Sequence, residues 1–307
     1  MKILVTGGAG FIGSNIADAY IKAGHRVVII DNLSSGKKAS INQKAKFYKL
    51  DINSHDLGKI FSREKFDLVN HHAAQIDVRK SVSDPAFDAK INILGSLNIF
   101  ENAKKYRVKK IIFASSGGTI YGECSSKTPD ENSAVNPLSP YGIAKLSIEF
   151  YLKYYRALYG MKYTVLRYGN VYGPRQDPHG EAGVVAIFSG KMLKNEKVKI
   201  FGDGKQMRDY VFVSDIAKAN LLSLSKGNDE IINIGTGEAT SVNKLFGEMA
   251  KIITSKEKPV YLPKRPGELF RSVLNIKKAK RVLGWKPEVS MAAGLRKTLD
   301  YFRNLGS

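Results

Sequence analysis

The 307-residue sequence predicts an α/β fold, in which a doubly wound parallel sheet is joined to a smaller C-terminal α/β unit. Three observations lead to this prediction. Short apolar runs alternate with helical patterns through the first half of the chain, which is typical of parallel β-α-β units. A glycine-rich loop joins the first apolar run to the first helical pattern. Small and hydroxyl-bearing residues follow later strands, at the edge where such sheets bind ligands.

The first strand and its loop open the chain. Residues Ile3–Thr6 favour a strand, and Gly7, Gly10 and Gly13 follow at three-residue spacing before a helical pattern that ends at Gly24. Glycine permits the sharp turn and the close approach of a pyrophosphate, which the amino end of a helix attracts. A packing turn can have the same spacing, so the context decides. Here strand, loop and helix all occur, which predicts a dinucleotide site.

A second strand, residues 26–30, indicates which dinucleotide binds. It ends in Asp31, at the distance from the loop expected of an acid that bonds the adenosine ribose hydroxyls. A carboxylate there repels a 2′-phosphate, and no arginine directly follows the strand. The sequence therefore favours NAD over NADP. We expect the loop from Asn32 through Ser35 to Gly36 to close over the adenosine.

The third and fourth strands are expected at residues 45–50 and 66–72. Asp51, at the end of the third, could meet the adenine amino group or cap a helix near residues 54–63. The fourth strand contains two consecutive histidines, whose side chains point to opposite faces, so we expect no metal site. It is followed by small residues that leave room for a ligand, namely Ala73 and Ala74.

Two long helices and a fifth strand come next. Asp84 is expected to cap, and Pro85 to open, a helix that reaches about residue 106. Within it, Asn92 is either a satisfied core amide or a residue that reaches the cofactor. The fifth strand, residues 110–114, leads into Ser115 and further hydroxyls and glycines up to residue 122.

The second long helix carries the strongest catalytic signal. Ser139 is expected to cap it, and it runs from residue 140 to about residue 159. Tyr141 and Lys145 are four residues apart and therefore share one face. A nearby ammonium favours the phenolate and lowers its pKa from about 10. Tyr-x-x-x-Lys alone is common, but behind a glycine fingerprint it predicts a tyrosine base assisted by lysine.

These residues resemble the extended short-chain dehydrogenase/reductase family, and within it the nucleotide-sugar 4-epimerase branch. The resemblance covers essentially the whole chain. It rests on segments 6–14, 31–32, 51–52, 141–145, 166–175, 202–210 and 265–268. It implies a Rossmann domain that binds NAD, expected over residues 1–175 with returns near 209–235, and a nucleotide-sugar domain over 176–307. The implied activity is NAD-dependent 4-epimerisation of a UDP-sugar through a transient 4-keto intermediate, for UDP-glucose and UDP-galactose or also the N-acetylated pair.

The resemblance also implies roles for single residues. The catalytic base would be Tyr141, with Lys145 as its electrostatic partner and ribose anchor. The implied cofactor-binding residues are Gly7, Gly10, Phe11, Ile12, Gly13, Asp31, Asn32, Ser35, Gly36, Asp51, Ile52, Ala73, Ala74, Asn92, Ser115, Tyr141, Lys145 and Tyr168. The implied substrate-binding residues are Ser116, Tyr141, Asn170, Val184, Val185, Arg208, Tyr210, Arg265 and Glu268. The two arginines would clamp the diphosphate, and Glu268 would bond the uridine ribose.

The chain departs from the family pattern at Gly117, where the catalytic Ser or Thr commonly stands. The hydroxyl is then expected from Ser116, with Ser115 and Thr119 as the other candidates. Sibling dehydratases place a carboxylate directly after the hydroxyl, but two glycines follow Ser116 here, which favours epimerisation. A dehydratase or reductase is the alternative within the enzymes. At the position where the family can carry a bulky tyrosine, this chain has Ser272, which suggests room for an N-acetyl group.

The remaining pattern predicts the second half of the chain. Helices are expected at Val184–Lys194, after a Ser214 cap, from Ser241, and on both sides of Gly284; strands are expected at residues 198–201, 209–213, 231–234 and 260–262. Apolar and aromatic residues on the two long helices, together with the family's four-helix dimer interface, predict a homodimer.

Composition bounds the partners and the location. The net charge of +21 would suit nucleic acid, and a non-catalytic dinucleotide sensor or RNA-binding protein is the alternative from another class. The lysines are spread along the chain, however, so we expect a solvated surface and no nucleic-acid partner. The single cysteine, Cys124, fits a reducing cytoplasm. No apolar run approaches the ~20 residues of a membrane span, and we expect no signal peptide.

Overall fold

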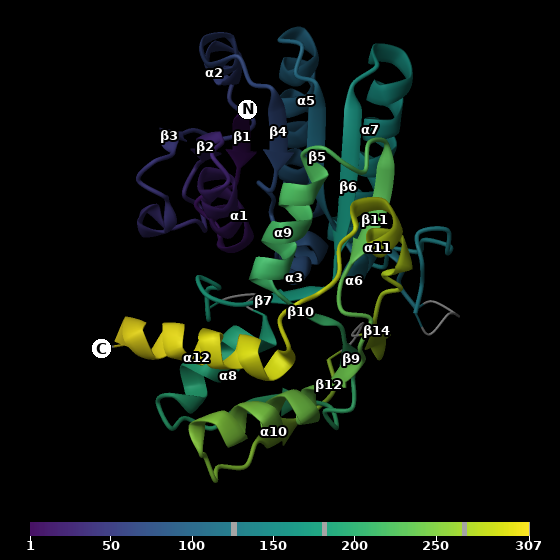
Figure 1. Cartoon of the computed structure of the whole chain (residues 1–307). Coiled ribbons are helices and arrows are strands. Elements are labelled where there is room, and N and C mark those ends of the chain that lie inside the picture. Colours follow the sequence, from purple (N-terminus) through teal and green to yellow (C-terminus); the bar gives the residue numbers. More distant parts are fainter. Residues whose placement is uncertain (124–127, 180–182, 266–268, 307) are drawn as a thin grey trace.

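The computed structural model describes residues 1–123, 128–179, 183–265 and 269–306. It contains one large sheet and three small ones. The large sheet has seven strands in the order β11-β6-β5-β4-β1-β2-β3, and all its neighbouring strands run parallel. These strands are β1 (Lys2–Thr6), β2 (Arg26–Asp31), β3 (Lys46–Lys49), β4 (Leu68–His71), β5 (Lys110–Ser116), β6 (Lys162–Tyr168) and β11 (Glu230–Ile234). The predicted parallel, doubly wound sheet is therefore confirmed (Figure 1).

Helices cover both faces of this sheet because its strands are apolar on both sides. On one face Ile3 and Val5 pack with α1 (Phe11–Lys22), α9 (Val213–Ser223) and α11 (Lys277–Leu283). On the other face Leu4 packs with α2 (Leu57–Glu64), α5 (Gly95–Lys105) and α7 (Pro140–Tyr159). Successive residues of one strand thus belong to different cores, as alternation along a strand requires.

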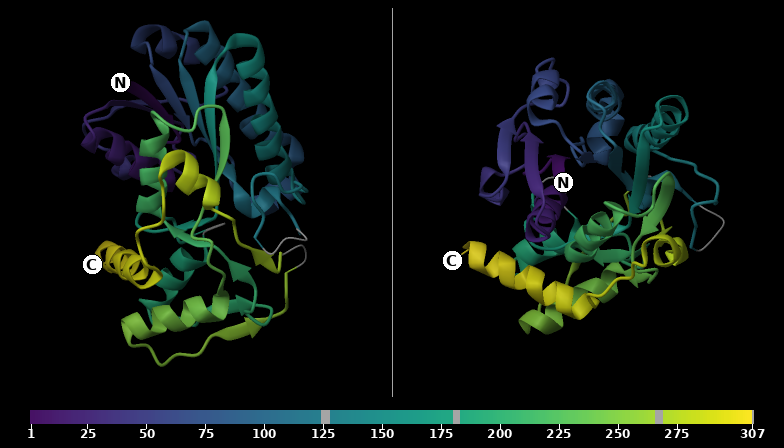
Figure 2. Two further views of the ribbon diagram at one scale, coloured as in Figure 1. Left: turned by 45° about the vertical axis from the view of Figure 1, so that its right-hand side comes forward. Right: turned by 45° about the horizontal axis from the view of Figure 1, so that its top comes forward.

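A third core forms a smaller lobe. It is built around α8 (Val184–Met192), α10 (Val242–Ile253) and α12 (Met291–Gly306). Its small sheets contain β7 (Asn170–Tyr172), β8 (Lys199–Phe201), β9 (Met207–Arg208), β10 (Tyr210–Phe212), β12 (Thr240–Ser241), β13 (Val260–Leu262) and β14 (Arg271–Ser272). Figure 1 and both views of Figure 2 show α8, α10 and α12 together beyond one end of the large sheet. The strands of the large sheet run toward that lobe.

The helix predicted from Pro85 to about residue 106 is present, but it is not uniform. It comprises α4 (Pro85–Ala89), the π-helical turn η2 (Lys90–Leu94) and α5, with Asp84 as the predicted cap. Before it, the structure adds the short helix α3 (Val78–Ser83), whose N-cap Asp77 accepts a hydrogen bond from the Lys80 amide. A π turn widens the helix by one residue and is frequent at functional sites.

Other boundaries also differ from expectation. The predicted Ser214 cap is wrong: α9 begins at Val213, its N-cap is Phe212, and no side chain caps it. Ser241 does cap α10, since its side chain accepts a hydrogen bond from the Lys244 amide. The sequence pattern missed two strands that follow α7, namely β6 and the three-residue β7. It also missed the short helix α6 (Gly117–Ile120), the 3-10 turn η1 (Lys38–Ser40) and the two-residue strands β9, β12 and β14. Except for β6, these pieces are too short to show a periodicity.

Candidate active site

The glycine loop is closed so tightly that side chains would not fit. Gly7 has φ of 68°, and a Cβ on Gly13 would lie 2.2 Å from the carbonyl oxygen of Gly7. A Cβ on Gly7 would lie 2.6 Å from the backbone nitrogen of Ala73, which follows β4. Helix α1 begins at Phe11 with no side-chain cap on Gly10. Its first amide groups are therefore available to an anion that approaches the loop.

Asp31 lies directly beside this loop. Its Oδ2 atom accepts a hydrogen bond of 3.0 Å from the Ala9 amide, and Oδ1 accepts one of 2.8 Å from the Leu33 amide. The segment after Asp31 folds back over the loop, because a Cβ on Gly36 would lie 2.8 Å from the Ala9 side chain. The predicted acid, the loop and the closing segment are thus assembled in one place, while Asn32 and Ser35 are exposed.

Asp51 does not cap a helix, so that alternative is wrong, and its contact with adenine stays a prediction. It accepts hydrogen bonds from Asn32 Nδ2 at 2.8 Å and from the Asn53 amide at 2.8 Å, whereas α2 begins six residues later, at Leu57. Burial raises the pKa of Asp51, but hydrogen bonds from Asn53 and Asn32 lower it more, so the net shift is downward. The Ile52 side chain is buried in the core. Only its backbone is available to a ligand.

The predicted catalytic pair occupies the first turns of α7. Ser139 caps the helix by accepting from the Gly142 amide, and Lys145 is buried. The ammonium donates a hydrogen bond of 3.0 Å to the Ala114 carbonyl of β5 and lies 5.7 Å from the centre of the Tyr141 ring. The helix thus holds both side chains at the carboxyl end of β5.

The electrostatics of the pair differ from our expectation. We expected Lys145 to lower the pKa of Tyr141, but burial and the carboxylate of Asp88 raise it. Burial lowers the pKa of Lys145 to about 8, and Asp88 opposes that shift. In the chain alone, burial is thus the largest cause of both pKa shifts, and it disfavours the charged form of each group. The sequence pattern did not identify Asp88, which is four residues before Asn92 on the same helix.

The three candidate hydroxyls have different surroundings. Ser115 Oγ is buried and donates a 2.6 Å hydrogen bond to Glu149 Oε1. Ser116 is half-buried, and its Oγ and that of Ser272 would both lie 3.8 Å from a Cβ on Gly118. Thr119 Oγ1 is buried without a hydrogen-bond partner in the described part of the chain. Ser115 is thus engaged with the protein, and Ser116 keeps its place as the candidate beside the predicted sugar pocket.

The side chain of Leu274 explains why a glycine stands at position 117. A Cβ at this position would lie 2.6 Å from Leu274 Cδ1. The backbone there faces a packed leucine, so neither a hydroxyl nor a carboxylate fits without moving Leu274. This agrees with the absence of an acid after Ser116 in the sequence.

The ends of β4 and β6 meet at a histidine–tyrosine stack. His72 Nε2 and the Tyr168 hydroxyl lie 3.1 Å apart, and Asn220 donates a hydrogen bond of 2.8 Å to the same hydroxyl. Burial, with the charge of Lys145, lowers the pKa of His72 to about 3. His71 instead bonds Thr6 and lies on the other face, as predicted. Among the described residues, no three His, Cys, Asp or Glu side chains group as a metal site would require.

Asn92 is satisfied within the protein. Its Oδ1 accepts from the Gln75 amide at 2.9 Å, and its Nδ2 donates to the Gln75 carbonyl at 3.0 Å and to Asp88 Oδ1 at 2.9 Å. It ties the segment after β4, which includes Ala73 and Ala74, to the π turn. The side chain is thus a satisfied buried amide, and its contact with a cofactor stays a prediction.

The predicted substrate residues come from the smaller lobe. Arg208 of β9 and Ser272 of β14 are paired neighbours, which brings the predicted clamp close to Ser116. The Arg265 guanidinium lies 3.7 Å above the centre of the Phe201 ring.

The other predicted substrate residues lie on several elements of the smaller lobe. The side chain of Val185 is buried in the core of the smaller lobe, so it and Val184 offer backbone amides at the uncapped start of α8. Asn170 is exposed on β7, and Tyr210 is buried on β10. Glu268 lies outside the described residues.

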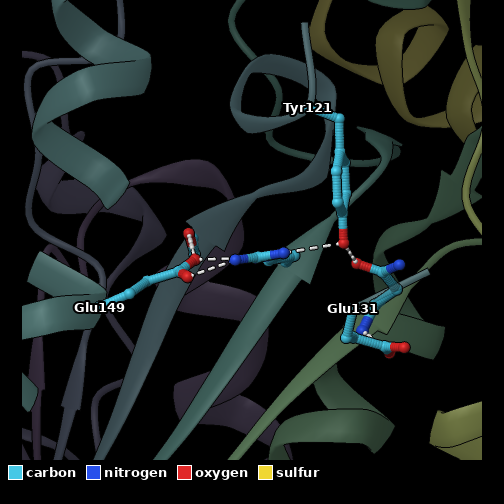
Figure 3. A network of polar contacts seen from close by, with 6 residues as sticks. Tyr121, Glu131 and Glu149 are labelled. Atoms are coloured by element: carbon cyan, nitrogen blue, oxygen red, sulfur yellow. Dashed lines mark hydrogen bonds and ion pairs between the residues drawn. The ribbon is translucent and has the colours of Figure 1, made fainter. Parts of the chain in front are cut away.

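A buried polar network, which the sequence pattern did not reveal, lies next to the catalytic pair (Figure 3). Arg167 of β6 donates to Glu149 from Nε at 2.9 Å and from Nη2 at 2.6 Å, and it reaches the Tyr121 hydroxyl at 2.9 Å. Glu149 is one helical turn beyond Lys145 on α7 and also accepts from Ser115. The network therefore connects the helix of the catalytic pair to the end of β5.

The helices can also be compared with a membrane span in length and hydropathy. None of the helices in the described ranges is both long and apolar enough to cross a membrane.

Comparisons with known proteins agree with this geometry. The model of the NAD-dependent epimerase/dehydratase family matches residues 3–235. UDP-glucose 4-epimerase from Mycolicibacterium smegmatis is 44% identical, and the alignment covers 99% of each chain. The crystal structure of UDP-glucose 4-epimerase from Thermotoga maritima with UDP-glucose has a TM-score of 0.98 and 52% identity over 100% of both chains. That of UDP-glucose 4-epimerase from Thermus thermophilus with NAD has a TM-score of 0.94 and 42% identity over 99% of each chain.

Proposed function

Because the chain belongs to the NAD-dependent epimerase/dehydratase family, we propose that it is an isomerase that inverts C4 of a UDP-sugar through a transient 4-keto intermediate. We put the UDP-glucose and UDP-galactose pair first. The observation that carries the proposal is the position of Lys145, bonded to Ala114 of β5 and 5.7 Å from the Tyr141 ring, close to Ser116, which ends the same strand. It is supported by a likeness, over the full chain, to UDP-glucose 4-epimerases.

The residues around the loop fit NAD. Gly7 and Gly13 make a cradle that a Cβ would fill, and the uncapped start of α1 suits a pyrophosphate. Asp31 is positioned by the Ala9 and Leu33 amides, so its carboxylate suits ribose hydroxyls and opposes a 2′-phosphate. When bound, NAD supplies the oxidant that accepts a hydride from C4 and returns it.

The chain's own residues supply orientation and proton transfer. In our proposal the Tyr141 oxygen takes the proton from the sugar 4-hydroxyl and later returns it. Ser116 orients that hydroxyl, and Lys145 holds the ribose and carries the nearby positive charge. The keto sugar turns about its diphosphate between the two halves of the reaction, so that the opposite face is presented.

The substrate clamp belongs to the smaller lobe. We propose that Arg208 and Arg265 hold the diphosphate by their guanidinium groups. The Val184 and Val185 amides at the start of α8 would assist, because that helix end has no side-chain cap. The remaining proposed contacts are Asn170, Tyr210 and Glu268. We place the boundary between the two domains at residue 175, because the proposed cofactor contacts lie before it and most of the proposed sugar contacts lie after it.

Incubation with UDP-galactose tests the proposal. We expect UDP-glucose to form until equilibrium is reached. The only cofactor needed is NAD, either retained by the protein or added to it. UDP-GlcNAc is tested beside it, because Ser272 lies close to Ser116 and, in our proposal, its small side chain leaves room for an N-acetyl group. Turnover of UDP-GlcNAc at a rate close to that of UDP-glucose is expected, and its rejection would contradict the role of Ser272. A net keto-sugar product would instead identify a dehydratase or reductase.

We propose a cytoplasmic location from the single cysteine, and no nucleic-acid partner. A salt-sensitive RNA gel shift without sugar turnover would favour the binding-protein alternative instead.

We also propose that the chain forms a homodimer through α7. Its outer face exposes large apolar side chains at helical spacing, and Leu158 is 64% exposed. The others on this face are Ile143, Phe150, Tyr151 and Tyr154. A continuous face of this kind is uncommon on a monomer, and a second copy offers the matching surface.

Light scattering tests the dimer. The expected mass is twice the 33.9 kDa of one chain. Phe150→Glu should shift the mass to one chain, whereas Tyr261→Glu, at an exposed aromatic residue outside α7, should not. A monomeric wild-type protein would reject the proposal.

A further inference from the structure

Asp88 is a buried carboxylate that none of the roles above uses. It is 1% exposed, at the end of α4 just before the π turn. Its Oδ1 atom accepts 2.9 Å hydrogen bonds from Gln75 Nε2 and Asn92 Nδ2. Its Oδ2 atom is buried and has no hydrogen-bond partner in the described part of the chain. A buried carboxylate oxygen without a partner is costly and needs a compensating charge.

Lys145 is the matching buried cation. It is 4% exposed, and among the described residues its ammonium donates a hydrogen bond only to the Ala114 carbonyl. Within the described ranges, no carboxylate comes within ion-pair distance of it. Helix α4, which carries Asp88, packs against α7, which carries Lys145. The Asp88 carboxylate interacts electrostatically with both Lys145 and Tyr141 across this helix contact.

The surrounding hydrogen bonds fix the direction of the Asp88 side chain. Gln75 and Asn92 both hold the same oxygen, Oδ1, which leaves Oδ2 as the oxygen free to act through space. Gln75 follows β4, and Asn92 lies in the π turn. A side chain held from two elements is locked in place, as the support of a functional site requires.

We propose that Asp88 is a further positioning residue of this site, whose buried carboxylate keeps Lys145 cationic and sets the charge balance of the Lys145–Tyr141 pair. The proposal rests on the function proposed above. Within the described residues, the Asp88 side chain makes no hydrogen bond to a proposed substrate residue, and it acts through the pair.

Other charged and titratable groups belong to the elements that pack around α4 and the pair. His71 and His72, behind Lys145, have pKa values lowered by burial, so they stay neutral near pH 7. The charged groups on and beside α3, α4 and the π turn are Asp77, Arg79, Lys80, Asp84 and Lys90. Those on α7 are Lys153, Glu149, which pairs with Arg167, and Arg156, which pairs with Asp229. Burial and the Asp88 charge shift the pKa values of Lys145 and Tyr141, so removal of Asp88 should change both pKa values.

The test is the pH profile of kcat for the holoenzyme with UDP-galactose, compared between the wild type and Asp88→Asn. A negative charge raises the pKa of a lysine and of a tyrosine alike. Removal of the charge should therefore lower the pKa values of Lys145 and Tyr141. Both limbs of the pH profile should then move to lower pH by about half a unit or more. Asp88→Glu should restore the wild-type position at least in part. KM for the UDP-sugar should stay unchanged.

Asp84→Asn is the matched control, because it removes a carboxylate from the exposed start of the same helix, where Asn can still accept the hydrogen bond from the Phe87 amide. We expect its profile to stay at the wild-type pH. If Asp88→Asn does not fold, Asp88→Ser removes the same charge and carries the same prediction. Lower activity at an unmoved pH optimum would overturn the proposal, while wild-type turnover would leave the proposed function standing. A wild type that does not turn over UDP-sugars would instead end the proposed function.

Discussion

Tyr141→Phe should lower kcat for UDP-galactose by about 10³-fold and leave the fold intact. General acid–base catalysis by one positioned group contributes typically 10²–10⁴-fold. The phenol oxygen makes no hydrogen bond within the described residues, so the variant loses a catalytic atom and no structural contact. Steady-state kinetics measure the effect, and thermal unfolding checks the fold.

The control for this variant lies on the same helix. Tyr151 is 38% exposed on the outer face of α7, so Tyr151→Phe makes the same chemical change away from the site. We expect its kcat within about twofold of the wild type, as for a surface substitution without a partner. Near-normal turnover by Tyr141→Phe would remove Tyr141 from the mechanism.

Glu149→Ala should destabilise the protein by about 3–5 kcal/mol, because it leaves the Arg167 guanidinium buried without its partner. The pair is almost fully buried, with side-chain exposures of 4% for Arg167 and 2% for Glu149. Glu149 also accepts from Ser115, so the variant frees the end of β5 (Figure 3). Urea unfolding measures the free energy, and kcat should fall as well because Ser116 follows Ser115.

A surface ion pair supplies the comparison. Glu288 bonds Lys218 at 2.5 Å, but their side chains are 50% and 39% exposed. Glu288→Ala should therefore cost less than about 1 kcal/mol. If Glu149→Ala were no more destabilising than Glu288→Ala, the buried network would not stabilise the site in the way described.

Much of the fold could be predicted because its strands and helices are long and periodic. The run from Ile3 to Thr6, the acid at Asp31 and the helix opened by Pro140 have local signals that tertiary contacts only reinforce. The π turn at Lys90–Leu94 could not be predicted, because it depends on packing around Asn92 and not on composition. Ser214 resembles a cap because it precedes Asp215 and an apolar run, and this pattern does not reveal that the helix already begins at Val213.

The site was predictable where its residues form a local pattern. Tyr141 and Lys145 are four residues apart, so the helix alone brings them together. Asp88 is far from them in sequence and becomes relevant only because α4 packs against α7. The i, i+4 relation of Asp88 and Asn92 was a signal, but an isolated acid on a helix is usually solvated. The same holds for Glu149 and Arg167, whose pairing depends on the sheet.

The most direct test of the account follows the hydrogen at C4 of the sugar. UDP-galactose that carries deuterium at C4 is incubated with the holoenzyme in ordinary water, and the UDP-glucose that forms is analysed by mass and by NMR. Removal and return of the same hydride predict that the deuterium stays at C4 of the product. Loss of the deuterium to solvent, or a product whose sugar is dehydrated or remains a ketone, would contradict it.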